Sequence, residues 1–96
     1  MHKLNTNSHD ASLLAMQALV WAISDDTRAE RLLSLTGLTP DALRAGITDP
    51  GLQAAILGFL ESHEPDLIAC AVAIDVSPAA LVTARRELDG NEGYYE

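Results

Sequence analysis

Residues 32–44 read LLSLTGLTPDALR, and this stretch contains the signals that end one helix and begin the next. Gly37 follows an apolar run and suits the left-handed backbone that commonly closes a helix. Thr39 suits an N-cap because its hydroxyl accepts a backbone N–H, and Pro40 suits the first helical turn because its φ is already helical. The stretch therefore predicts a helix that ends at Gly37 and a second that begins at Pro40.

The same start signal recurs outward along the chain. Each of the four prolines follows a Thr, Asp, Glu or Ser, and no stretch alternates apolar and polar residues as a strand does. We therefore predict an all-α fold, a compact bundle of five to six short helices. The expected helices run from Ser8 or Asp10 to Ile23 and then over about 26–36, 40–46, 50–62, 67–74 and 78–88.

The length of 96 residues predicts one domain, and a hydrophobic content of 48% is enough for one core. We expect a flexible N-terminal segment over 1–10, a single helical domain over 11–89 and a flexible acidic tail over 90–96. The formal charge of −8 argues against broad electrostatic attraction to nucleic acid or to an anionic membrane.

The two halves of the chain resemble each other when one is shifted by 38 residues. Trp21 then aligns with Phe59, and Thr39 aligns with Ser77, each of these two preceding a proline. Two explanations stay open: a duplicated unit, or two helix-turn-helix units that look alike because both use ordinary caps.

The single cysteine excludes an internal disulfide and favours the reducing cytosol, so we predict a cytoplasmic protein. No apolar run approaches the ~20 residues of a membrane-spanning helix. Leu13 to Ile23 is apolar apart from Gln17, and residues 1–24 could serve as an export signal. A core helix is the favoured interpretation, because Lys3 is the one firm positive charge before this run.

The sequence offers no constellation for catalysis, metal binding or a cofactor. His2, His9, His63 and Cys70 form no pair spaced to place two ligands on one helical face. Cys70 lies among alanines and valine with no neighbouring base, which is typical of a core position. We therefore predict a protein that is not an enzyme and that binds neither metal nor cofactor.

The two most apolar helices point to an interface. The helices that contain Trp21 and Phe59 are apolar on more than one side, and so short a chain has little interior to cover both. We predict an interface at Leu14, Ala18, Trp21 and Phe59, formed with a second copy in a homodimer or with an unidentified protein partner.

The alternative hypothesis is a nucleic-acid-binding helix-turn-helix over residues 67–88. In that case Arg85 and Arg86 would contact phosphates. The neighbouring acids Glu87 and Asp89 and the overall negative charge make nucleic acid the less favoured partner.

Residues 32–44, Asp49-Pro50-Gly51 and the stretch ALVWAI at 18–23 together resemble a small alphaproteobacterial family, domain of unknown function 3572. The resemblance covers about residues 12–90. It implies a short, cytoplasmic, all-helical protein and brings no activity, cofactor or catalytic residue. The function is thus unknown from the sequence, and a non-enzymatic helical protein-interaction module that self-associates is the leading hypothesis.

Overall fold

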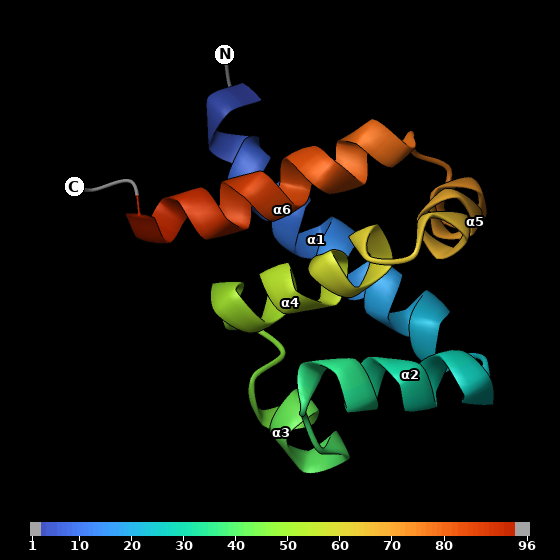
Figure 1. Ribbon diagram of the computed structural model, residues 1–96. Helices are drawn as coiled ribbons and strands as arrows, with labels where there is room; N and C mark the ends of the chain where they lie inside the picture. The colour runs from blue at the N-terminus through green and yellow to red at the C-terminus, as the bar shows by residue number, and fades with distance from the viewer. Residues whose placement is uncertain (1–2, 94–96) are drawn as a thin grey trace.

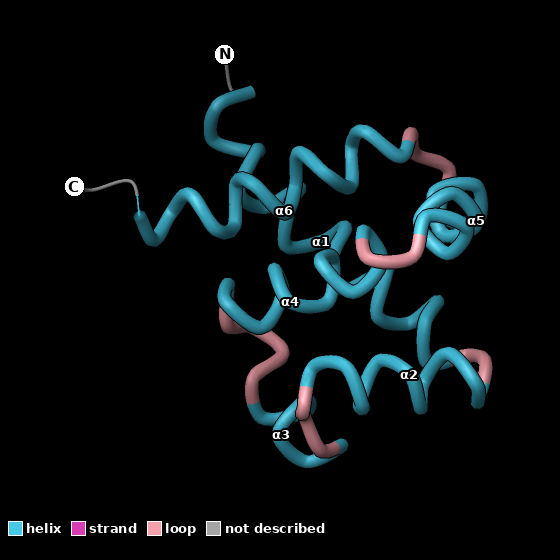
Figure 2. The backbone as a smooth tube through the Cα atoms, in the orientation of Figure 1, coloured by secondary structure: helices cyan, strands magenta, loops and turns pink. Residues whose placement is uncertain are grey.

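The computed structural model describes the backbone of residues 3–93 and the side chains of residues 10–90. Within that part of the chain, six helices and no strand are present, so the predicted all-α fold is confirmed. Short loops join the helices (Figure 2). The helices are α1 (Lys3–Ile23), α2 (Asp26–Thr36), α3 (Pro40–Ala45), α4 (Pro50–Glu61), α5 (Glu64–Ile74) and α6 (Pro78–Gly93).

The helix ends follow the predicted capping residues. Thr39 Oγ1 accepts the backbone N–H of Ala42 at 3.0 Å, and Ser77 Oγ accepts that of Ala80 at 3.1 Å. Gly37 closes α2 with a φ of 73°, the left-handed conformation expected of a C-cap glycine. Local side-chain chemistry therefore sets these boundaries.

Three helices are longer than predicted. α5 begins at Glu64 instead of at about residue 67, with Pro65 in its first turn. α1 begins at Lys3 instead of Ser8 or Asp10, because the polar residues before Ser8 include no proline or glycine to stop it. α6 runs past Leu88 and through Gly90, because a single glycine within a helix lowers helix stability by only about 1 kcal/mol relative to alanine. Of the predicted flexible segments, residues 1–2 and 94–96 lie outside the described residues.

α1, α4 and α6 pack against one another at the centre of the fold (Figure 1). The side of α1 that faces this core is made of alanines, all at most 1% exposed. Small side chains let helix backbones approach closely, and α4 and α6 fill the space with leucine and isoleucine. We call this side the alanine face; its residues are Ala11, Ala15, Ala18 and Ala22.

One buried amide connects three parts of the fold. Gln53 on α4 is 2% exposed, and its Nε2 donates to Ser12 Oγ of α1 and to the Ile47 carbonyl, both at 2.9 Å. Burial of a polar group is costly unless it is hydrogen-bonded, so these two contacts satisfy the Nε2 group of the amide while holding α4 to α1 and to the loop after α3.

The two halves of the chain share local hydrogen bonds at positions 38 apart. Ser24 Oγ donates to the Trp21 carbonyl at 2.7 Å, and Ser62 Oγ donates to the Phe59 carbonyl at the same distance. The helix order also matches, with α1, α2 and α3 corresponding to α4, α5 and α6. The sequence similarity thus extends to local geometry.

The halves differ where α3 and α6 end. α3 stops at Gly46, whereas its counterpart α6 continues through the equivalent Ala84. A Cβ on Gly46 would lie 2.8 Å from Leu52 Cδ1, so the chain turns here against the side chain of α4. The short α3 lies at the edge of the fold, while the long α6 joins the core (Figure 1).

A larger side chain on the alanine face should destabilise the fold. We expect Ala18→Leu to lower the free energy of unfolding by about 1–3 kcal/mol, because the extra carbons must displace the core. Ala69→Leu, on the exposed side of α5, is the matched control and should change stability little. Urea denaturation followed by circular dichroism measures both, and equal stability of the two variants would contradict close packing at Ala18.

Candidate interaction surface

The four residues predicted for the interface do not form one exposed surface. Ala18 is fully buried in the alanine face, and Phe59 is buried in the core. Leu14 and Trp21 are half-buried, and Leu14 lies beside Thr83 and other residues of α6. Because the alanines of α1 face the core, its larger side chains lie on other sides of the helix.

Trp21 is partly covered by an arginine from the next helix. The Arg28 guanidinium carbon lies 3.8 Å from the centroid of the Trp21 ring. The same guanidinium donates through Nη2 to the Trp21 carbonyl at 2.7 Å and to Ser24 Oγ at 3.1 Å. These contacts stabilise the turn between α1 and α2. The guanidinium also covers the face of the indole ring that a partner would otherwise contact.

The exposed apolar surface of α1 lies instead on the side opposite the alanine face. Leu13, Met16, Val20 and Ile23 are each at least 37% exposed, and Val20 is 64% exposed. Their spacing of three, four and three residues places them in one row along the helix. We call these four residues the α1 stripe.

The sequence shows the residues of the α1 stripe as one of two rows at helical spacing, but it does not show which row faces the core. Residues 11–23 contain two rows at helical spacing, one of alanines and one of large apolar residues. A search for the most apolar side assigns the large row to the core. The structure reverses that assignment, because only the small row fits against both α4 and α6.

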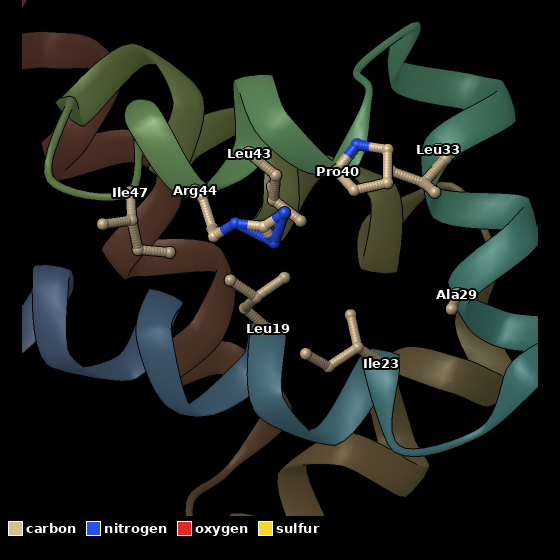
Figure 3. A pocket seen from close by; sticks show the side chains of 8 residues that line it. All are labelled: Leu19, Ile23, Ala29, Leu33, Pro40, Leu43, Arg44 and Ile47. Carbon is tan, nitrogen blue, oxygen red and sulfur yellow. The ribbon is translucent and has the colours of Figure 1, made fainter.

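A second apolar feature adjoins the stripe. A groove with a volume of about 370 Å³ lies between α1, α2 and α3 (Figure 3). Ile23 belongs to both features, so the stripe and the groove form one continuous surface. We call this feature the α1–α3 groove; its walls include Leu19, Ile23, Ala29, Leu33, Pro40 and Leu43.

One cation lines the α1–α3 groove. Figure 3 shows the Arg44 side chain lying over Leu19 and Leu43, between Ile47 and Pro40. Arg44 Nη2 donates to Asp41 Oδ1 at 2.9 Å, and both side chains are largely exposed. An exposed pair of this kind is weak, so the guanidinium is available to a third group.

The candidate nucleic-acid residues are placed differently from each other. α5 and α6 meet at 101°, an angle typical of helix-turn-helix units. The Arg85 guanidinium, however, hydrogen-bonds Glu61 on α4, and its Nη1 lies 2.6 Å from Asp89 Oδ2. The Glu61 hydrogen bond raises the pKa of Arg85, and the two carboxylates offset its charge. Arg86 is exposed to solvent.

A small polar cluster joins α2 to the start of α5. The Asp66 carboxylate is largely buried, pairs with Arg31 of α2 and lies 3.2 Å from His63 Nδ1. Among the described residues, no group of three or more His, Cys, Asp or Glu side chains could hold a metal ion. The Arg31–Asp66 pair connects α2 to α5, and the Arg31 guanidinium carbon also lies 5.6 Å from the centroid of the Phe59 ring.

Over the described part of the chain, no single helix is both long and apolar enough to cross a membrane. The α5–α6 pair has the required length and composition together, but it bends by 101°.

Comparison with known proteins places the chain in a family. Residues 8–91 match the model of a protein family of unknown function, DUF3572. The chain belongs to this family. No curated protein and no solved structure matches the chain. The proposed function of this DUF3572 protein is therefore argued from its own surface.

Cys70 of this DUF3572 protein lies in the core, as the sequence predicts. Its side chain is fully buried on α5. Burial raises the pKa of the thiol to about 11; Arg28 opposes this rise and Asp66 adds to it. A thiol that stays protonated at neutral pH is a poor nucleophile, so Cys70 is a packing residue.

The raised pKa predicts a loss of stability at alkaline pH. The unfolded thiol loses its proton near its ordinary pKa of 9.0, whereas the folded thiol keeps it up to about 11. The unfolded chain then binds fewer protons than the folded one, so the free energy of unfolding falls as the pH rises from about 9 to 11. Urea denaturation at a series of pH values should show a steeper decline for the wild type than for Cys70→Ala. Parallel declines would contradict this assignment.

Proposed function

We propose that this DUF3572 protein is a non-enzymatic helical interaction module that self-associates through the α1 stripe. The observation that carries the proposal is the row of four large apolar side chains that α1 exposes on one side, away from its own core. Such a row loses contact with water when a second copy covers it, which favours association.

The spacing of the stripe suits helix-to-helix packing. Leu13, Met16, Val20 and Ile23 follow the three-four alternation of the a and d positions in a coiled coil. Two-fold symmetry brings the same surface of each copy together, so α1 would pack on α1 of the second copy. The side chains of one row would then fill the spaces between those of the other.

The charge distribution also supports self-association at this place. Two copies with a formal charge of −8 each repel one another at long range. Residues 11–24 contain no charged side chain, so contact through the α1 stripe keeps the acidic groups of both copies outside the interface. Since salt screens the remaining repulsion, association should strengthen as ionic strength rises.

The alternative functions have less support from the geometry. Arg85, one of the two candidate phosphate-binding residues, is already held by two carboxylates.

We also propose a cytosolic location. It is supported by the single cysteine, Cys70, which is buried as a free thiol, the form that the reducing cytosol maintains.

A charge placed in the α1 stripe should prevent self-association. We expect the wild type to show the mass of a dimer by light scattering and Val20→Glu to show that of a monomer, because dimerisation would bury two unpaired carboxylates. Leu35→Glu is a matched control, since Leu35 on α2 is also 64% exposed but lies outside the stripe. This control should remain a dimer.

Two results would contradict the proposal. One is a wild-type protein that stays a monomer throughout a concentration series. The other is a dimer that Val20→Glu and Leu35→Glu weaken equally, which would place the interface elsewhere. Circular dichroism of all three proteins checks that each variant keeps its helices.

A further inference from the structure

The α1–α3 groove has one charged side chain among apolar walls. Arg44 lies toward the side where Ile47 borders the groove, and Ile23, Ala29 and Leu33 border the opposite side (Figure 3). Apart from Arg44, every residue that lines the groove is apolar. A ligand that fits this arrangement has one anionic group and an apolar body.

We propose that the α1–α3 groove binds a small amphiphilic carboxylate of the medium-chain fatty acid class. The carboxylate pairs with the Arg44 guanidinium, and the acyl chain lies along the walls formed by α1 and α2. This site adjoins the α1 stripe and shares Ile23 with it, so the two proposals are tested apart below.

The guanidinium has free capacity for this contact. Arginine carries five N–H donors in a planar fork that matches the two oxygens of a carboxylate. Among the described side chains, Arg44 donates one hydrogen bond, to Asp41. The nearby negative charge of Asp41 weakens the attraction for a second anion, so its removal should strengthen binding.

The dimensions and the chemistry of the walls suit an acyl chain. The volume of about 370 Å³ lies within the range of about 300–1,000 Å³ that small-molecule sites occupy. Leu19, Leu33 and Pro40 offer apolar surface with no competing hydrogen-bond donor in their side chains. Burial of the chain against them removes its apolar surface from water.

A helix from another protein fits the groove less well. A helix that carries several acids would approach Asp41, which pairs with Arg44, on a protein with a formal charge of −8, and like charges repel. A basic helix would be attracted by that overall charge but would place like charge against Arg44, the one charged residue that lines the groove. A single carboxylate on an apolar chain matches this one cation and the apolar walls around it.

The test is a titration of the isotope-labelled protein with decanoate, followed by NMR amide shifts below the concentration at which decanoate forms micelles. We expect saturable binding with the largest shifts at residues of the groove, such as Ala29, Leu33 and Leu43. Decanol, which has the same chain without the charge, should bind about threefold to tenfold more weakly.

Three variants separate the contributions of the head group and the chain. Arg44→Gln should weaken decanoate binding about threefold to tenfold and leave decanol unaffected, while Asp41→Asn should tighten decanoate about twofold. Ala29→Leu should fill the groove and abolish binding of both. Arg86→Gln, which removes an exposed cation outside the groove, is the control and should bind as the wild type does.

The titration is repeated with Val20→Glu so that self-association and ligand binding are tested apart. Saturable binding by this variant would support the site whatever the oligomeric state of the wild type. Absence of saturable binding in both proteins would overturn the proposal. So would equal affinity for decanoate and decanol, shifts confined to the α1 stripe, or a groove that rejects decanoate and accepts an amphipathic helical peptide.

Discussion

The contact between the alanine face of α1 and the helices α4 and α6 determines the rest of the surface. Close approach of three helices requires small side chains on at least one of them, and α1 provides Ala11, Ala15, Ala18 and Ala22. Once these alanines face the core, the helical period places the large apolar residues of α1 elsewhere. The α1 stripe is therefore a consequence of how the core is packed.

The α1–α3 groove has a related origin in the unequal halves of the chain. α6 is long enough to pack along both α1 and α4, whereas α3 stops at Gly46 and covers little of α1. Gly46 is held against Leu52, where a larger residue would collide. The side chains of Leu19 and Ile23 are left to line an apolar groove with Arg44 at one side. A difference in helix length between otherwise similar halves thus creates a candidate site.

Polar contacts connect the peripheral helices to this core. Arg31 and Asp66 join α2 to α5, and Arg85 joins α6 to Glu61 on α4. These pairs explain why two of the chain's arginines are unavailable to an outside partner. Arg44 differs because its partner Asp41 lies one turn away on the same exposed helix, so the pair connects no two helices and leaves most donors unused.

The sequence by itself determined the all-α fold, most helix boundaries and the buried state of Cys70, since caps, prolines and apolar residues act locally or through simple burial. It also pointed to α1 and α4 as helices with surplus apolar surface, and the structure exposes such a surface on α1 while it buries Phe59 of α4 in the core. Only the tertiary structure decided which row of α1 faces outward, that Trp21 is covered by Arg28 and that α1, α2 and α3 enclose a groove. These features depend on the distance between helices far apart in the chain, and helical periodicity carries no information about that distance.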